Sequence, residues 1–112
     1  MEVQLNDCSK SGAVVVKAGG RIDALSAPDF EEKIKPLLES EYTNLILEFS
    51  DLEYISSAGL RAILKMAQGC KKTNRKLFIC GLIPSVHEVF KISGFDLILN
   101  IQPDLDTVLS SI

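Results

Sequence analysis

Two adjacent serines at the start of a helical pattern are the side chains of this sequence best placed for chemistry. In the stretch DLEYISSAGLRAILKM, Ser56 and Ser57 precede the small residues Ala58 and Gly59, and an apolar periodicity begins at Leu60. One serine here is explained as a helix N-cap, whose oxygen accepts a hydrogen bond from a free amide. A cap explains neither the second serine nor a glycine in the first turn, which costs ~1 kcal/mol relative to alanine. The stretch therefore also predicts a hydroxyl that stays accessible to a second protein.

The other reactive residues form no recognisable catalytic or metal-binding set. His87 is the only histidine, and a zinc site needs three or four ligands. A triad of Ser57, His87 and an aspartate would lack the GxSxG turn of α/β hydrolases. The glycines of AGG at residues 18–20 do not open a helix as a dinucleotide-binding motif does, and no Walker-type phosphate loop occurs. We therefore expect no enzymatic activity, no metal and no cofactor.

Length, composition and charge limit the class of protein and its location. A chain of 112 residues is long enough for one domain with its own core. Its apolar share of 46% and charged share of 24% are ordinary for a globular protein, and a net charge of −3 argues against nucleic-acid binding. The first ten residues do not resemble a signal peptide, and no apolar run approaches the ~18 residues of a membrane helix. Cys8, Cys70 and Cys80 form no CxxC motif, which predicts reduced thiols and a cytoplasmic location, with Cys80 in the core.

The first part of the chain predicts a hairpin followed by a helix. Residues 2–5 alternate polar and apolar side chains, residues 9–12 are typical of a turn, and residues 13–20 are a β-branched run that ends in glycines. Ser26 is a suitable N-cap for the helix that follows. Pro36 cannot donate a backbone hydrogen bond and predicts a kink or a split in that helix. The apolar face of the helix consists of Phe30, Ile34, Leu37 and Leu38.

The rest of the chain alternates strands and helices. Residues 43–50 and 77–81 are apolar runs typical of strands covered on both faces, and residues 96–100 predict a shorter strand. Pro84 suits the first turn of a helix, and Gly94 is placed to end that helix in a left-handed conformation. Three helices are expected, with apolar faces formed by Leu60, Ile63, Leu64 and Ala67, by Val86, Val89 and Phe90, and by Leu105, Val108, Leu109 and Ile112.

This order of elements predicts an α/β fold: a mixed, mainly parallel sheet opened by an antiparallel hairpin, with four helices packed on it. We expect a single domain over residues 1–112. The serine pair follows a strand and a crossing loop at residues 50–55. It should therefore lie at the carboxyl ends of the strands, where partners and ligands usually bind in such sheets.

The segment around the two serines resembles a known family. DLEYISSAGLRAIL is similar to the signature of STAS domains, in particular bacterial anti-sigma factor antagonists, in which a buried strand and an apolar loop lead to a D-S-x-G-[LI] segment at a helix start. GGRIDALSAPDFEEKI resembles the earlier segment of the family, and KLFICGLIPSVHEVFKISGFDLIL resembles its later strand, helix and strand. The resemblance covers the whole chain.

The resemblance implies a binding protein that works by partner switching. The unmodified antagonist binds an anti-sigma factor that is also a serine kinase, and a sigma factor is released. The kinase then phosphorylates a serine, which by motif position is Ser57, and a phosphatase restores the antagonist. Ser56 stands where the family has an aspartate, and it is also a rival acceptor. The residues expected to contact the partner are Asp23, Ser26, Ser56, Ser57, Gly59 and Arg61.

Two alternatives remain open. Asp23 matches a family aspartate, but it is equally well explained as a turn residue that binds nearby backbone amides. The chain could also be a STAS-like module of a larger signalling assembly that binds its partner without a phosphate switch or senses a small anion. A small hydrolase or nucleotide-binding enzyme is disfavoured because no catalytic set is present. We expect a monomer without direct contact to nucleic acid or membrane.

Overall fold

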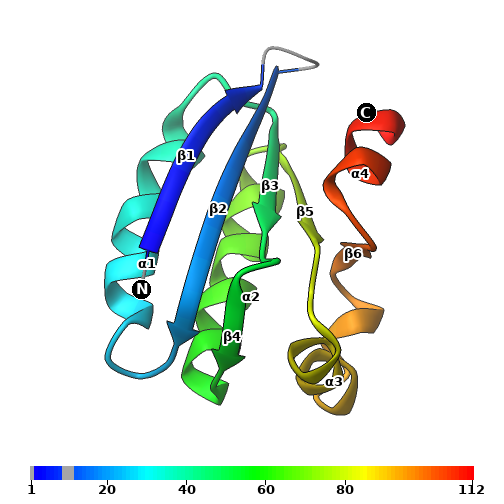
Figure 1. Cartoon of the computed structure of the whole chain (residues 1–112). Coiled ribbons are helices and arrows are strands. Elements are labelled where there is room, and N and C mark those ends of the chain that lie inside the picture. Colours follow the sequence, from blue (N-terminus) through cyan, green and yellow to red (C-terminus); the bar gives the residue numbers. More distant parts are fainter. Residues whose placement is uncertain (1, 9–11) are drawn as a thin grey trace.

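A computed structural model describes residues 2–8 and 12–112, with the side chains of residues 7 and 8 left out of the description. The turn expected at residues 9–12 lies largely outside the described residues. Figure 1 shows a sheet with helices around it. The strands are β1 (Glu2–Cys8), β2 (Ala13–Ile22), β3 (Asn44–Glu48), β4 (Leu52–Ile55), β5 (Lys76–Cys80) and β6 (Asn100–Gln102). The helices are α1 (Ala27–Ile34), α2 (Ser57–Lys72), α3 (Pro84–Ile92) and α4 (Leu105–Ser111), with 3₁₀ helices η2 (Lys35–Glu39) and η3 (Phe95–Leu97).

The sheet has the predicted mixed topology. Its strand order is β1-β2-β3-β5-β6, and β4 pairs with β2 beside this row. β1 and β2 form an antiparallel pair, and the other pairs are parallel. β2 is ten residues long and serves two neighbours: its first half pairs with β3, and its end pairs with β4 after a register shift between Gly20 and Arg21.

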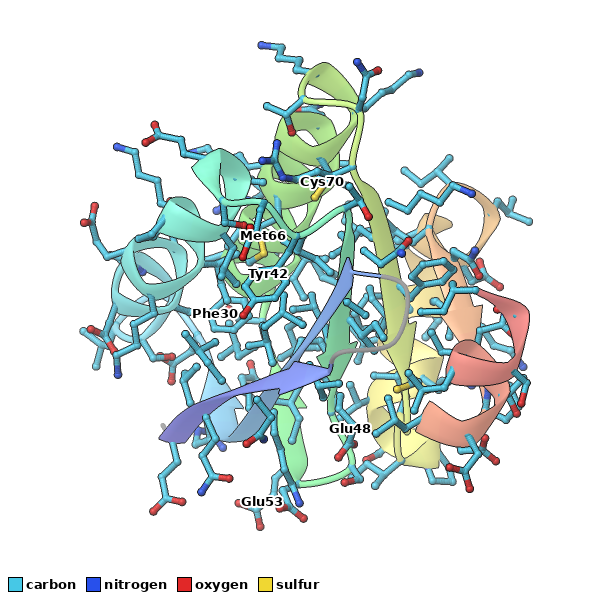
Figure 2. All side chains as sticks on the ribbon, turned by 90° about the horizontal axis from the view of Figure 1, so that it is seen from above. Phe30, Tyr42, Glu48, Glu53, Met66 and Cys70 are labelled. Carbon is cyan, nitrogen blue, oxygen red and sulfur yellow. The ribbon has the colours of Figure 1, made fainter. Side chains whose placement is uncertain are left out.

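Helices cover the two faces of the sheet unequally. Val14, Val16 and Ala18 of β2 face a large core that also contains Phe30 of α1 and Phe90 of α3. The alternate residues Ala13 and Val15 face a small core closed by Val108 of α4. α1 and α2 lie behind the sheet in Figure 1, and Figure 2 shows Phe30 and Met66 on that side, with Glu48 and Glu53 on the other. α4 therefore covers only part of the second face.

Several local predictions are confirmed. The helix that begins at Ala27 ends at Ile34, and Pro36 falls in the 3₁₀ turn η2, as expected for a residue that cannot donate to the preceding turn. Pro84 is the first residue of α3. Gly94 ends that helix with φ 78° and ψ 4°, which is the left-handed conformation. Cys80 is fully buried in the core.

Two strand predictions are wrong. Residues 52–55, expected as part of a loop, form β4, because the end of β2 extends beyond β3 and its backbone groups pair with this segment in parallel. Leu52 and Ile55 are buried in this strand, while Glu53 and Tyr54 are exposed. The strand expected at residues 96–100 is replaced by η3, and pairing with β5 begins only at Asn100.

The apolar face of α2 is rotated from the predicted one. Leu60 and Ile63 are buried as expected, but Leu64 is only half-buried and lies outside the core clusters. The buried face turns instead toward Met66 and Cys70. The reason is that α2 packs against α1 and η2 as well as against the sheet, so that Gly69 lies against the side chain of Leu38.

This rotation predicts unequal effects of two neighbouring substitutions. Ile63→Ala should lower the free energy of unfolding by ~2–5 kcal/mol, because the side chain is fully buried. Leu64→Ala should cost less than half of that, because Leu64 keeps solvent contact and leaves no closed cavity. Urea unfolding at constant m-value measures both losses. Equal losses would place Leu64 in the core after all.

Candidate functional site

The end of β2 and the start of α2 meet at one edge of the sheet. Ile22, the last residue of β2, is aligned with Ile55, the last residue of β4. The amide of Ser56 donates to the carbonyl of Ile22 at 2.9 Å. The structure therefore brings together two of the segments singled out in the sequence, the one around Asp23 and the one around the serine pair.

The two serines have different environments. Ser56 is the N-cap of α2: its Oγ accepts a hydrogen bond from the amide of Gly59 at 3.2 Å, and its carbonyl accepts one from Leu60 at 2.9 Å. Ser57 is the first residue of the helix and is exposed. Within the described part of the chain, the Ser57 hydroxyl has no hydrogen-bond partner. One hydroxyl is therefore used by the fold, and the other is free for a second molecule.

Gly59 is small for a structural reason that the sequence analysis missed. The residue is buried, and a Cβ placed on it would lie 2.7 Å from the carbonyl oxygen of Ile22 and 2.8 Å from side-chain carbons of Ile22 and Ile55. The expectation that small residues here keep the serine hydroxyl accessible stays a prediction, and the packing of Gly59 is a separate reason for the glycine. Its absent side chain lets the first turn of α2 rest directly on the ends of β2 and β4.

Asp23 and Ser26 hold a tight turn between β2 and α1. Asp23 Oδ1 accepts hydrogen bonds from the amides of Leu25 at 3.0 Å and Ser26 at 3.1 Å. Ser26 occupies the N-cap position of α1, as expected, but its hydroxyl does not make the side-chain capping bond. The hydroxyl instead donates to the carbonyl of Arg21 at 2.7 Å and accepts from the amide of Asp23 at 3.0 Å. This geometry matches the interpretation of Asp23 as a turn residue.

The electrostatics of this turn favour a charged aspartate. The hydrogen bond from the Ser26 amide is the main cause that lowers the pKa of the Asp23 carboxyl below its ordinary value. Desolvation raises this pKa. The Leu25 amide, the Ser26 hydroxyl and the Arg21 charge lower it further. Because the folded-state pKa is depressed, Asp23 stabilises the fold above its ordinary pKa of 3.8 and loses that effect as the pH falls further.

Three residues near the site were missed in the sequence. Leu25, at the tip of the Asp23–Ser26 turn, has 92% of its surface exposed. The guanidinium of Arg21 lies 4.1 Å from the ring centroid of Tyr54, which is 40% exposed, and Arg21 Nε lies 3.7 Å from an Asp23 carboxylate oxygen. An isolated leucine between turn-forming residues was the available signal for Leu25. Tyr54 and Arg21 could not be found, because their contact depends on the unpredicted strand β4.

Arg61 is the remaining residue expected at the site. It is exposed and lies four residues after Ser57, which places both on one face of α2. Among the described side chains, Arg61 forms no ion pair, unlike Lys65, whose Nζ lies 4.0 Å from a carboxylate oxygen of Glu31. A positive charge is therefore available one helical turn from the free hydroxyl.

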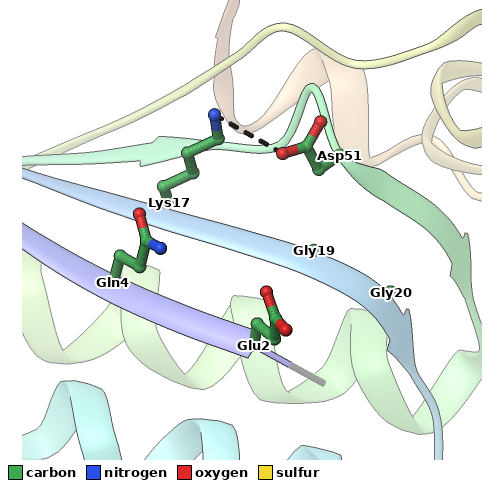
Figure 3. Close-up of a pocket in the computed structure, with 6 residues that line it drawn as sticks. All are labelled: Glu2, Gln4, Lys17, Gly19, Gly20 and Asp51. Atoms are coloured by element: carbon green, nitrogen blue, oxygen red, sulfur yellow. Dashed lines mark ion pairs between the residues drawn. The ribbon is translucent and has the colours of Figure 1, made fainter.

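A polar hollow of about 330 Å³ adjoins this edge on the uncovered face of the sheet (Figure 3). It is lined by Glu2, Gln4, Lys17, Gly19, Gly20 and Asp51. Lys17 Nζ lies 3.4 Å from Asp51 Oδ2 and 4.0 Å from Glu48 Oε2. Since two carboxylates already surround this ammonium group, the hollow is poorly suited to bind an anion.

The described residues contain no group of three or more His, Cys, Asp and Glu side chains that could hold a metal ion. His87 is half-buried on α3 and is not hydrogen-bonded to Ser57. Over the same described residues, the structure includes no helix of the length and apolar character that crossing a membrane requires.

The sequence model of the STAS domain matches residues 5–108. The chain belongs to the STAS domain family. Among similar proteins, a Bordetella bronchiseptica protein named putative anti-sigma factor antagonist BtrV is 33% identical over 84 residues, which are 75% of this chain and 72% of the relative. The serine pair, the turn at Asp23 and the α2 start therefore lie within the matched region of a STAS domain.

Solved structures show the same STAS fold. An anti-sigma factor antagonist from Mycobacterium paratuberculosis has a TM-score of 0.88 at 22% identity, over 99% of this chain and 92% of that one. The Bacillus cell fate determinant SpoIIAA in its phosphorylated form has a TM-score of 0.73 at 18% identity, over 99% of this chain and all (100%) of that one. At these identities the likeness concerns the fold.

The contact of Gly59 with β2 predicts opposite effects at two glycines of α2. Gly59→Ala should lower the free energy of unfolding by ~1–3 kcal/mol, because backbone atoms would have to shift. Gly69→Ala is the matched control: its Cβ would meet only the flexible end of Leu38, so the gain in helix propensity, up to ~1 kcal/mol, should dominate. Thermal and urea unfolding compare the two. A stabilising Gly59→Ala would contradict the close contact.

Proposed function

We propose that this STAS domain is an anti-sigma factor antagonist. It binds an anti-sigma factor with serine kinase activity, and this binding releases a sigma factor. Phosphorylation of Ser57 ends the interaction, and a phosphatase restores it. The name of the Bordetella relative supports the antagonist role, and so does the resemblance of the serine segment to the family signature. On this proposal residues 1–112 act in the cytoplasm as one monomeric domain with no catalytic activity of their own.

The free hydroxyl of Ser57 carries the proposal. It is exposed at the first position of α2, whereas the Ser56 hydroxyl is engaged as the cap of the same helix. The Ser57 hydroxyl can enter a kinase active site without the loss of any hydrogen bond of the fold. The Ser56 hydroxyl would first have to give up its bond with the amide of Gly59.

A phosphate on Ser57 should be tolerated within the folded domain. It adds a charge of about −1.5 to −2 at the positive end of the helix dipole. The amides of Ser57 and Ala58 lie before the first intrahelical hydrogen bonds and can donate to its oxygens. Arg61 on the next turn supplies a positive charge on the same face. The cost of the modification then falls on the complex, where the phosphate must be desolvated against the partner.

The surface around Ser57 provides the partner contacts. Leu25 is an exposed apolar side chain on a turn that Asp23 and Ser26 hold by hydrogen bonds, so little entropy is lost when a partner covers it. Tyr54, with Arg21 stacked on it, is an aromatic and basic pair of the kind common in interfaces. On this proposal Asp23 and Ser26 act by positioning Leu25, and Gly59 acts by positioning Ser57.

A binding module without a phosphate switch is the second candidate. The observation that favours it is Ser56, which stands in place of the aspartate of the family motif and removes a carboxylate beside the acceptor. Such a module would bind its partner through the same surface and would not be modified.

Phosphate mapping separates the two serines and the two candidates. Incubation with the cognate kinase and ATP should give one phosphate on Ser57 in the wild type and in Ser56→Ala, and none in Ser57→Ala. Mass spectrometry of the peptide identifies the residue. Phosphate retained by Ser57→Ala and lost by Ser56→Ala would assign the acceptor to Ser56. Binding without any phosphorylation would support the second candidate.

Binding measurements test the surface apart from the fold. Ser57→Asp should keep the melting temperature within a few degrees and lose most of the affinity for the anti-sigma factor, because the charge acts in the complex. Leu25→Ala should weaken binding about tenfold or more, the effect of ~1.4 kcal/mol at an interface anchor. Leu5→Ala on β1, also an exposed leucine, is the matched control and should bind as the wild type does.

Calorimetric titration measures the affinity of each variant, and thermal melts of the same samples measure its stability. Early melting of Ser57→Asp would make Ser57 a structural residue.

A further inference from the structure

A second surface lies toward the other end of α2. A hollow of about 270 Å³ opens between the last turns of α2, the start of β5 and the segment that joins η3 to β6. Cys70 lies on the helix side of this hollow, and Figure 2 shows it near the end of α2. The lining residues are Ala67, Cys70, Lys71, Arg75, Lys76, Leu77, Phe78, Ile98, Leu99 and Asn100.

The charged side chains that line this hollow are all positive. Lys71, Arg75 and Lys76 line it, and no carboxylate does. Among the described side chains, neither lysine forms an ion pair. The guanidinium of Arg75 donates to the carbonyls of Tyr42 at 2.9 Å and Thr73 at 3.3 Å, and also to that of Ser40. These acceptors are neutral, so they fix the position of the guanidinium and leave its charge uncompensated.

Exposed apolar side chains continue the same surface. Ile98, which lines the hollow, has 65% of its surface exposed, and the adjacent Leu97 has 86%. Hydrogen bonds from Gly94 to Lys91 and from Leu97 to Gly94 keep this part of the chain in two tight turns. Exposed apolar side chains therefore lie in the basic hollow and directly next to it.

We propose that this basic–apolar surface, formed by Lys71, Arg75, Lys76 and Ile98 in the hollow and by the adjacent Leu97, binds an acidic amphipathic segment of a partner protein. The leucine and isoleucine side chains would receive the apolar side of such a segment, and the lysines would face its carboxylates. The proposal does not depend on the phosphate switch at Ser57.

The charge distribution favours this occupant over three others. In a symmetric dimer the same patch meets itself, so that two sets of unpaired lysines would face each other. An anionic membrane would be repelled by the net charge of −3 and would gain little from a concave site. A nucleic acid would be repelled by the same charge and would leave Leu97 and Ile98 against its phosphates.

The position of this surface allows both ends of α2 to be occupied together. Lys71 follows Ser57 by 14 residues of continuous helix, which corresponds to about 21 Å along the axis. That separation exceeds the ~8–10 Å screening length of physiological salt, so a charge on Ser57 would change binding at the far end only weakly. The domain would thus be held at one end while its serine is modified at the other.

A synthetic probe tests the surface directly. The probe is a capped helix of leucine and glutamate with leucine at heptad positions a and d, and its control carries lysine in place of glutamate. Titration of the full chain, followed by amide NMR shifts, should give shifts from the glutamate helix at the end of α2, the start of β5 and η3. Lys76→Glu should weaken this binding roughly fivefold, the effect of ~1 kcal/mol for an exposed ion pair. Lys35→Glu on η2 is the matched charge change and should leave binding unchanged.

The outcomes are distinct. Weakening by both Lys76→Glu and the double substitution Leu97→Gln with Ile98→Gln supports the proposal, provided that thermal melts show both variants folded. Equal binding of the lysine helix, equal effects of Lys35→Glu and Lys76→Glu, or shifts confined to the Ser57 edge would overturn it. The proposal would also be overturned if the probe does not bind while phosphatidylglycerol vesicles do. It would likewise be overturned if the probe does not bind and sedimentation shows a dimer that the Lys76→Glu variant disrupts.

Discussion

The approach of Gly59 to the carbonyl oxygen of Ile22 is the contact on which the site depends. A Cβ at this position would lie 2.7 Å from that oxygen, so only glycine lets the first turn of α2 rest on the end of β2. The same carbonyl accepts the amide of Ser56 and thereby fixes the N-cap residue. Once Ser56 is fixed, its hydroxyl closes the cap, and the next residue must begin the helix on the outside. The exposure of Ser57 is thus a consequence of backbone packing two residues away.

The length of β2 makes this contact possible. A strand of ten residues extends beyond β3, and its free end is paired by β4, which delivers the chain directly to α2. The register shift between Gly20 and Arg21 also places Arg21 beside Tyr54, so that the guanidinium of Arg21 lies over the ring of Tyr54. Pairing of one long strand with two successive partners therefore creates the turn at Asp23, the stacked pair and the serine segment as one surface.

Much of the fold could be predicted, because it follows from local chemistry. Pro36 and Gly94 determine the local backbone conformation in any sequence context: proline lacks an amide hydrogen, and glycine adopts the left-handed conformation. The buried strands are visible as apolar runs. β4 could not be predicted because its four residues do not alternate: Leu52 and Ile55 are buried and the two residues between them are exposed. The rotation of α2 away from Leu64 had no local signal either, since it results from the packing of α1 and η2. The serine pair was found from sequence, but the choice between cap and free hydroxyl required the position of Ile22.

The presence of Ser56 in place of the aspartate of the family motif changes charge more than structure. Serine and aspartate are about equally good N-caps, and the hydrogen bond to the Gly59 amide shows that serine fills this role here. An aspartate would add a negative charge to the helix start and would repel a phosphate on the next residue. With serine, the partial positive charge of the helix N-terminus and the amides of Ser57 and Ala58 are left for the phosphate alone. On the proposed switch, the substitution therefore removes one repulsion from the phosphorylated domain and leaves the cap intact, while the carboxylate beside the acceptor is lost. If Ser57 is modified as proposed, the stability of the folded state and the affinity for the partner would then respond separately to the phosphate.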